Sequence, residues 1–315
     1  MERVWGGRRL EALYAKSLPP VVPIGESWEI SDRPGAASVI SNGPLAGRDL
    51  RWLMEHYAAA ILGPRLARRH RVFPLLIKIL DARDKLSLQV HPPRRVAARL
   101  AGDPKTEMWF ITHAERGADL YVGLKRGVTR AEFEKRIADG TVARCFHRLP
   151  VRAGDAMFLP SGRVHAIGAG NVIFEIQQNS DTTYRVFDWN RVGLDGKPRD
   201  LHVTESLASI NFEDFEPPLI RRKPGRAPSS TRRIVDNPLF RVEHRRLAAR
   251  KDARLAGGQA QILGVVKGRL RITEAASDTI VQLAPGGFCL LPAALTHVRV
   301  TAETGAEFLR AIATG

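Results

Sequence analysis

The sequence predicts a mainly β protein of two β-barrels, with a few helices inserted in its N-terminal part. Two observations predict this class. Short apolar runs bounded by Gly and Pro recur along most of the chain, which is typical of strands in a sandwich or barrel. Apolar residues at helical spacing, by contrast, are confined to two segments before residue 140. With 315 residues, the chain is long enough to bury a substantial core.

The elements of the first half follow from these patterns. Residues 21–45 mix short apolar alternation with Gly and Pro, which predicts strands and turns. Residues 47–71 carry apolar side chains at spacings of three and four, with Pro64 near the end, and predict an amphipathic helix. A second helix is predicted over 129–138, where Thr129 can cap and a Glu follows at the capping-box spacing. Strands are predicted from Phe73 onward at LLIKIL, LSLQV, MWFIT, LYVGL, AMFLP, NVIFEIQQ and TYRVFDW.

The second half predicts a separate β-domain. Residues 217–233 are basic, rich in Pro and Ser, and poor in large apolar side chains, so we expect a linker there. The predicted domains are therefore 1–216, which contains the helices, and 234–315. Strands of the second domain are predicted at QILGVV, GRLRIT, TIVQL, FCLLP, HVRV and EFLRAI.

Composition excludes several classes of protein. No run approaches the roughly 18 apolar residues of a membrane span, and the first ten residues are too polar for a signal peptide, so we expect a cytoplasmic protein without a membrane partner. The formal net charge of +16 would suit a nucleic-acid binder. However, the 49 Lys and Arg residues are spread over the whole length and accompany no nucleic-acid-binding motif, so we expect no such partner. Cys145 and Cys289 are too few for a disulfide framework or a four-thiolate zinc site, so mainly His and carboxylates must hold any metal.

Three pieces of sequence carry residues typical of metal ligands. Gln89 and His91 lie two positions apart, so on a strand both face the same side. Glu107 opens the next predicted strand. The segment from Gly154 to His165 has the spacing G-x5-P-x-G-x2-H, which is that of the second cupin motif. Two imidazoles, a carboxylate and an amide oxygen suit one Zn²⁺ per chain, although other first-row divalent ions are possible. The predicted barrels are therefore cupin, or jelly-roll-like, barrels.

Several motifs in the right order carry a family resemblance. DKLSLQVHP, KTEMWF and HAIGAGNVIFEIQQNSDTTYRVFDWNR resemble the type I phosphomannose isomerases, in their shorter bacterial form. This resemblance implies metal-dependent interconversion of mannose 6-phosphate and fructose 6-phosphate through an enediolate. It covers roughly residues 1–215. It places Gln89, His91, Glu107 and His165 at metal-ligand positions, Arg185 at the active-site arginine, and Ser87, Lys105, Asp181 and Arg191 along the substrate cavity.

The resemblance leaves parts of the chemistry open. The general base is a water on the metal, Glu175 or Lys105, and the sequence does not order these candidates. The substrate phosphate is assigned to Lys85, Lys105 or Arg191. Two rival functions are an iron-dependent cupin oxygenase and a non-catalytic, sugar-sensing cupin. A monomer and a homodimer are equally compatible with the sequence.

The C-terminal part repeats the turn spacing. Gly286, Pro292 and His297 stand at the same intervals, but Ala294 replaces the second glycine of the motif. No preceding strand offers a matching His or Gln pair. We therefore predict a degenerate second cupin in which His297 is not a metal ligand.

Overall fold

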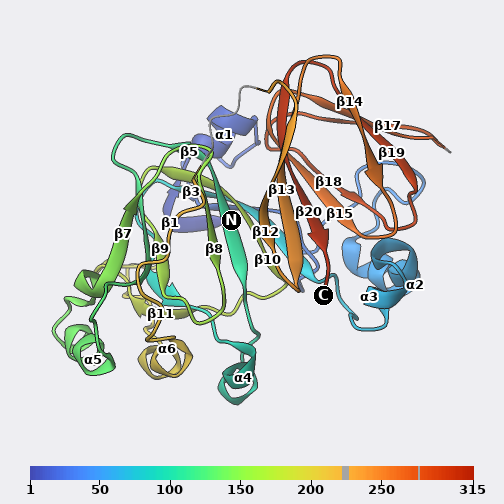
Figure 1. Cartoon of the computed structure of the whole chain (residues 1–315). Helices are drawn as coiled ribbons and strands as arrows, with labels where there is room; N and C mark the ends of the chain where they lie inside the picture. Colours follow the sequence, from blue (N-terminus) through green and yellow to red (C-terminus); the bar gives the residue numbers. More distant parts are fainter. Residues whose placement is uncertain (222–226, 276) are drawn as a thin grey trace. The chain divides into compact units, whose positions relative to one another are not determined.

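The computed structural model describes residues 1–221, 227–275 and 277–315 (Figure 1). The chain forms two compact units. The first unit contains Met1–Leu10, Ser17–Ser27 and Ile79–Arg222, and the second contains Glu11–Lys16, Trp28–Lys78 and Lys223–Gly315. In the described residues, no helix is long and apolar enough to cross a membrane.

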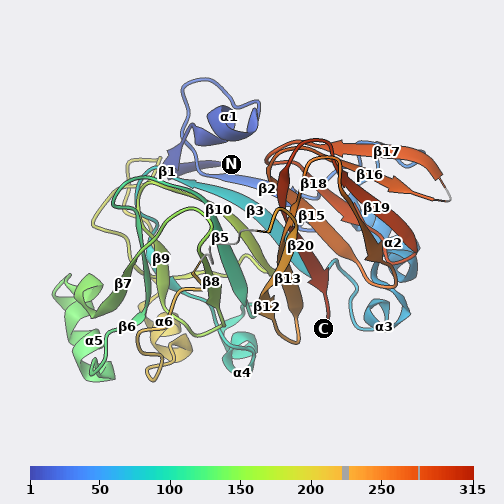
Figure 2. The same cartoon turned by 45° about the horizontal axis from the view of Figure 1, so that its top comes forward.

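Two five-stranded antiparallel sheets form the framework of the first barrel (Figure 2). One has the order β2-β3-β10-β5-β8, with β2 (Glu26–Ile30), β3 (Leu75–Ala82), β10 (Asn171–Gln178), β5 (Glu107–Ala114) and β8 (Ala156–Leu159). The other has the order β11-β4-β9-β6-β7, with β11 (Tyr184–Phe187), β4 (Leu88–Val90), β9 (His165–Ile167), β6 (Asp119–Leu124) and β7 (Phe146–Pro150). The N-terminal strand β1 (Glu2–Gly7) bridges to Ile24.

The barrel core lies between these two sheets. Trp109 and Ile173 of the first sheet belong to the same buried cluster as Leu120 and Ile167 of the second. Because side chains alternate across a strand, residues two positions from these also face the barrel interior. The side chains of Glu107, at the start of β5, and of Glu175, near the end of β10, therefore face the barrel interior.

Helices cover the outer face of the second sheet, where another apolar cluster forms around Phe133 and Phe146. The predicted helix at 129–138 is confirmed as α5 (Arg130–Ala138), and Thr129 accepts a hydrogen bond from the Glu132 amide, as the capping pattern predicts. The shorter helices are α1 (Arg9–Tyr14), α4 (Arg94–Ala97), α6 (Val203–Ser209), η1 (Ala98–Leu100) and η2 (Val142–Cys145).

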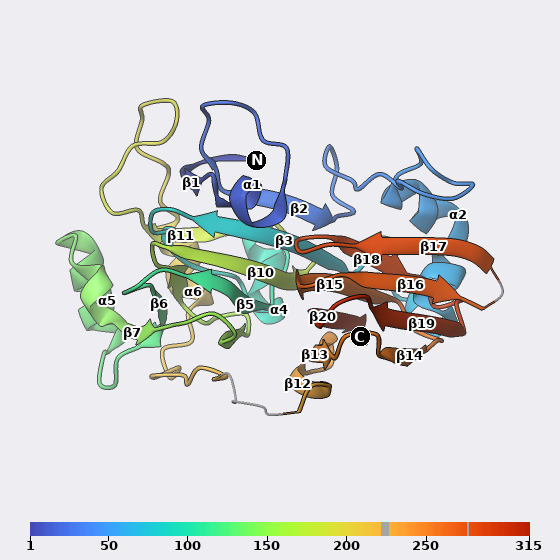
Figure 3. The ribbon, with the colours of Figure 1, turned by 90° about the horizontal axis from the view of Figure 1, so that it is seen from above.

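The second unit contains the C-terminal barrel (Figure 3). One sheet has the order β12-β13-β20-β15-β18, with β12 (Ser230–Asp236), β13 (Phe240–Leu247), β20 (Ala306–Ala313), β15 (Gln261–Lys267) and β18 (Phe288–Leu291). The other has the order β14-β19-β16-β17, with β14 (Asp252–Ala256), β19 (His297–Ala302), β16 (Leu270–Glu274) and β17 (Ser277–Leu283). Leu263, Phe308 and Val300 are part of the core between them. A mainly β protein with four antiparallel sheets confirms the predicted fold class.

The helix predicted over 47–71 is wrong as a single element. The structure has α2 (Leu50–Leu62) and α3 (Pro64–Ala67), separated at Gly63. Gly63 takes a φ of +83°, a conformation that favours glycine, and Pro64 starts the new helix because it lacks the amide proton that would continue the old one.

Each compact unit is built from several separate segments of the chain, whereas each predicted domain is one continuous segment. Residues 28–78, which the sequence assigns to the first domain, belong to the second unit. Backbone hydrogen bonds of 2.9 Å from the amides of Ala293 and Ala294 to the end of α2 contribute to this grouping. The predicted linker lies partly on residues 222–226, outside the described residues, and β12 already begins at Ser230. The predicted domain boundaries therefore stay a prediction.

Candidate metal centre

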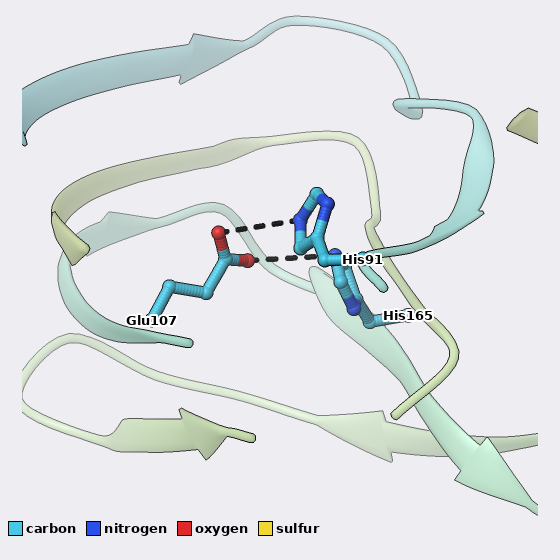
Figure 4. A group of neighbouring side chains, drawn as sticks. All are labelled: His91, Glu107 and His165. Atoms are coloured by element: carbon cyan, nitrogen blue, oxygen red, sulfur yellow. Dashed lines mark ion pairs between the residues drawn. The ribbon is translucent and has the colours of Figure 1, made fainter. Parts of the chain in front are cut away.

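Three strands of the first barrel bring His91, Glu107 and His165 together (Figure 4). His91 directly follows β4, Glu107 is the first residue of β5, and His165 is the first residue of β9. All three are buried, with exposed fractions of 2%, 0% and 1%. One potential ligand atom from each lies within 4.8 Å of the others.

The carboxylate of Glu107 lies between the two imidazoles. Its Oε2 is 3.4 Å from His91 Nε2, and its Oε1 is 3.4 Å from His165 Nε2. The two rings lie with centroids 4.8 Å apart. Figure 4 shows one nitrogen of each ring, the Nε2 atom, directed toward the carboxylate.

Backbone carbonyls fix which nitrogen of each ring faces the carboxylate. His91 Nδ1 lies 2.8 Å from the carbonyl oxygen of Thr182, and His165 Nδ1 lies 2.9 Å from that of Arg163. A carbonyl can only accept, so each Nδ1 carries the proton and donates it. In the neutral rings, each Nε2 then presents a lone pair to Glu107. Metal-binding histidines are usually oriented in this way.

The charge balance at the site fits a cation. Burial lowers the pKa of His91 to about 3, with the Lys105 ammonium adding to the effect, and burial also lowers the pKa of His165. Both rings are therefore neutral near pH 7. His91 Nε2 and Glu107 Oε1 have no hydrogen-bond partner among the described residues. Buried acceptors that face one another without a proton between them are costly, and a divalent cation would satisfy them.

Gln89 lies beside this group on the inward face of β4. It pairs with His165 across the strands, and its Nε2 is 3.3 Å from His165 Nε2. Its Oε1 accepts a hydrogen bond of 3.3 Å from the Ser87 hydroxyl. A half-turn of the amide would direct its oxygen toward the metal position, so the geometry is compatible with the predicted fourth ligand.

Lys105 contributes a permanent positive charge. Its Nζ is 3.0 Å from Glu107 Oε2, and its side chain is buried. Burial alone would lower the pKa of Lys105, but the carboxylates of Glu107 and Glu175 outweigh that effect and raise it. In turn, the pKa of Glu107 is well below its usual value: burial opposes ionisation, but the Lys105 ammonium and the contacts with His91 and His165 together outweigh the effect of burial. Asp181 is exposed and acts on Lys105 electrostatically.

Glu175 is a second buried carboxylate on the inward face of β10. Its Oε2 accepts a hydrogen bond of 2.9 Å from Trp109 Nε1. The Trp109 ring packs edge-on against His165, with centroids 5.3 Å apart. Glu175 therefore lies one side chain away from the proposed ligands.

Arg185 lies on β11, opposite Gln89 in the register of the two strands. Residues that pair directly share a face, so the guanidinium extends to the same side as Gln89. Its Nη1 donates a 2.6 Å hydrogen bond to the carbonyl of Asp200, whereas its buried Nε has no hydrogen-bond partner among the described residues. Burial lowers the pKa of Arg185, and Arg199 adds repulsion, but an arginine remains charged at any working pH.

Arg191 is already bound by protein groups. Its Nη2 donates to Asp188 at 2.8 Å, and its Nη1 donates to the carbonyl of Lys85. The same Asp188 accepts two hydrogen bonds from Arg199, at 2.6 and 2.7 Å. The Lys85 ammonium lies over the Trp189 ring, 4.5 Å from its centroid. Sequence reasoning missed Asp188 and Arg199, and a lone Asp followed by several Arg gave no motif that could have identified them.

The turn before His165 is held by an ion pair that sequence reasoning also missed. Arg163 donates two hydrogen bonds of 2.8 Å to Asp214 and one of 2.7 Å to the carbonyl of Phe158. Gly162 has a φ of +91°, and its amide donates to the carbonyl of His91 at 2.9 Å. The turn thus links the two histidine-bearing segments, as the Pro-x-Gly-x-x-His spacing predicts.

Known proteins resemble this chain in sequence. The model of the family "Phosphomannose isomerase type I, catalytic domain" matches residues 1–104. The mannose-6-phosphate isomerase of Streptococcus mutans is 39% identical over 207 residues, which cover 65% of this chain and 64% of that protein. GmuF of Bacillus subtilis, described as a probable mannose-6-phosphate isomerase, is 38% identical over 217 residues, covering 68% and 67%. The sequence matches span about two thirds of these curated relatives.

Solved structures resemble the chain over its whole length. The crystal structure of mannose 6-phosphate isomerase from Bacillus subtilis has 27% sequence identity and a TM-score of 0.88, covering 99% of this chain and 96% of that one. A zinc-bound mannose 6-phosphate isomerase with 19% identity shares the fold, with a TM-score of 0.76 over 100% of this chain and 97% of that one. The resemblance found in the motifs is confirmed. The chain belongs to the type I phosphomannose isomerases, in their short bacterial form.

Proposed function

We propose that this protein is a metal-dependent mannose-6-phosphate isomerase that binds one Zn²⁺ per chain. The observation that carries the proposal is the buried group of His91, Glu107 and His165, whose acceptor atoms face one another. Gln89 would supply a fourth, weaker ligand. The zinc-bound structure of the same fold supports the choice of metal, although other first-row divalent ions suit the same ligands. We expect the protein in the cytoplasm, as the sequence predicts.

The reaction moves a proton between C1 and C2 of the sugar and develops negative charge on the two neighbouring oxygens. A bound divalent ion supplies Lewis-acid polarisation of those oxygens. Arg185 lies on the same face as Gln89, and its Nε has no hydrogen-bond partner in the part of the chain that the structure describes. A fixed guanidinium there would stabilise charge as it develops. Because Arg185 stays protonated, it would act as an electrostatic stabiliser and not as a base.

Of the two side chains considered as general base, Glu175 fits better. The raised pKa of Lys105 keeps its ammonium protonated, so Lys105 is suited to balancing charge and not to accepting a proton. Glu175 lies buried on the inward face of β10 and is oriented by Trp109. We therefore propose Glu175 as the protein group that accepts the proton, with water as the alternative.

The substrate phosphate would bind near Lys85 and Arg191. The carbonyl of Lys85 accepts a hydrogen bond from Arg191, which brings the two cationic residues together at the end of the loop before β4. Lys105 is less suited to this role because its ammonium is held by Glu107. Ser87 and Asp181 complete the proposed substrate positions, Ser87 through its hydrogen bond to Gln89.

A metal-reconstitution assay tests the proposal. The protein is stripped of metal, reloaded with individual divalent ions, and assayed for fructose 6-phosphate formed from mannose 6-phosphate. We expect turnover to return with Zn²⁺ or another first-row ion and to be absent without metal. Metal binding without turnover for any ion would favour the sugar-sensing function. Oxygen consumption with Fe²⁺, without isomerisation, would favour the oxygenase.

A further inference from the structure

In the first sheet of the C-terminal barrel, the strands pair in the same register as the strands around the candidate metal centre, but the residues at the matching positions differ. Glu107 pairs with Leu159, six residues before His165, and Gln261 pairs with Leu291, six residues before His297. Gln261 is therefore the counterpart of Glu107. It faces inward, because Leu263 and Val265 at the next alternate positions belong to the barrel core.

The counterpart of the second carboxylate is an arginine. In the first barrel, Gln177 of β10 pairs with Glu107, and Glu175 pairs with Trp109, two residues further along β5. In the second barrel, Ile312 of β20 pairs with Gln261, and Arg310 pairs with Leu263, two residues further along β15. Arg310 thus stands in the place of Glu175. Two acidic residues of the first barrel are replaced by an amide and a cation at matched inward positions of the second.

The contacts of Arg310 are made within the barrel. Its Nε donates to Gln261 Oε1 at 2.7 Å, and its Nη1 lies 3.3 Å from Glu243 Oε2. Gln261 Nε2 in turn donates to the carbonyl of Ala256 at 2.6 Å. Glu243 and Arg310 are largely buried, with side-chain exposures of 13% and 14%. Glu243 therefore balances the charge of one arginine.

A second arginine lies on the same face, and no carboxylate among the described residues forms an ion pair with it. Arg245 is two residues from Glu243 on β13 and pairs with Phe308, a core residue, so its side chain starts toward the barrel interior. Its Nε is buried and has no hydrogen-bond partner among the described residues, while the side chain as a whole keeps some exposure. Burial lowers the pKa of Arg245, and repulsion by Arg310 adds to this effect. Among the described residues, the guanidinium groups of Arg245 and Arg310 thus share one nearby carboxylate, that of Glu243.

From this excess of buried donors we infer that the C-terminal barrel binds an oxyanion, with Arg245 as its principal contact and Arg310 as the second cation. A guanidinium offers a planar pair of donors that matches phosphate and carboxylate groups. A metal is not expected here, because His297 is exposed and pairs on its strand with Ala256, and the described residues of the barrel hold no counterpart of the His–Glu–His group. This inference does not depend on the isomerase activity.

Titration calorimetry with inorganic phosphate, and separately with succinate, tests the inference on the full chain. We expect saturable binding of at least one of these anions by the unmodified protein, and the preferred anion tells a phosphate site from a carboxylate site. Arg245→Gln should weaken that binding by about tenfold or more, because one charge-assisted pair is lost. Arg245→Lys, which keeps the charge but not the planar fork, should fall in between.

The matched control is Arg254→Gln, which removes the same charge from an exposed position on β14 of the same barrel. It should leave anion affinity unchanged, and all three variants should keep their isomerase turnover, which shows that they are folded. Three results would overturn the inference: no saturable binding by the unmodified chain, equal affinity in Arg245→Gln, or an equal loss in Arg254→Gln.

Discussion

The two barrels share the strand order of their first sheet and a turn spacing, yet among the described residues only the first barrel brings candidate metal ligands together. In the first, Glu107 and His165 are both buried and face each other. In the second, Gln261 is buried at the matching position, but His297 is exposed. The comparison teaches that the fold supplies inward positions at strand ends, and that single residues decide whether those positions bind a cation.

The histidines differ in the face of the strand they occupy. In β9, His165 and Ile167 face inward, and Ile167 belongs to the core. In β19, Val298 and Val300 are the core residues, so His297 points to the other side. A shift of one residue is enough to move a side chain from one face to the other. The turn before β9 uses Gly162 at a φ of +91°, whereas Ala294 at the corresponding position has no positive φ.

The largest effect should separate the two histidines. His165→Ala removes a buried ligand from a small set, so we expect loss of both stoichiometric zinc and turnover. His297→Ala changes an exposed side chain and should alter neither. Metal analysis by mass spectrometry and the isomerase assay check both variants. Equal losses in the two would remove the distinction between the barrels.

The next effect concerns Arg185, which pairs with Gln89 across the strands beside the candidate metal centre. Arg185→Ala should lower turnover by a factor of about 100 to 1000, with metal content and the Michaelis constant near normal, if its charge acts mainly on the transition state. Lysine at this position should rescue only partly. Unchanged turnover with a much raised Michaelis constant would instead make Arg185 a phosphate anchor.

A smaller effect is expected from the ion pair that holds the turn before His165. Asp214→Asn leaves Arg163 without its carboxylate and should weaken zinc affinity by about 10- to 100-fold, because the carbonyl that orients His165 is less firmly placed. The matched control is Asp155→Asn, which breaks the ion pair of Arg221 before the start of β8. Competition with a zinc chelator measures both. If Asp155→Asn weakened zinc affinity as much as Asp214→Asn, the loss would reflect general destabilisation and not the placement of His165.

The smallest effect lies in the C-terminal barrel. Contact with His244, whose Nε2 is 3.4 Å from Glu307 Oε2, lowers the pKa of Glu307 to about 2. A carboxylate with a lowered folded-state pKa stabilises the fold above its unfolded pKa of about 4.5, and that contribution is lost as the pH falls toward about 2. Glu307→Gln should therefore destabilise by less than about 1 kcal/mol near neutral pH, because the pair is partly exposed.

Denaturant unfolding of Glu307→Gln and of the unmodified chain, at neutral and at acidic pH, measures this difference. The gap between the two midpoints should narrow as the pH falls. A gap that stays constant from neutral pH to about pH 3 would show that the Glu307 charge contributes nothing to stability.

The grouping of His91, Glu107 and His165 could be predicted because these residues lie in short, local patterns. The alternation of Gln89 and His91, and the spacing that ends at His165, each follow from the geometry of one strand or one turn. The strand-rich architecture and the helix capped by Thr129 were accessible for the same reason.

Features that depend on distant segments were not predictable. Asp214 reaches Arg163 from 51 residues away, and no local pattern marks such a pair. The break at Gly63 lay within a continuous helical pattern, and the grouping of residues 28–78 with the second unit depends on tertiary hydrogen bonds. The excess of arginine at Arg245 and Arg310 was hidden among the 49 basic residues of the chain.

The most direct test of the account exchanges the residues that distinguish the two barrels. Glu107→Gln gives the first barrel the amide that the second has at Gln261, and Gln261→Glu makes the reverse change. We predict one zinc per chain in the unmodified protein and in Gln261→Glu, and no retained zinc in Glu107→Gln, because the neutral amide removes the only negative charge among the ligands. Full zinc occupancy in purified Glu107→Gln would contradict the assignment of Glu107 and, with it, the proposed metal centre.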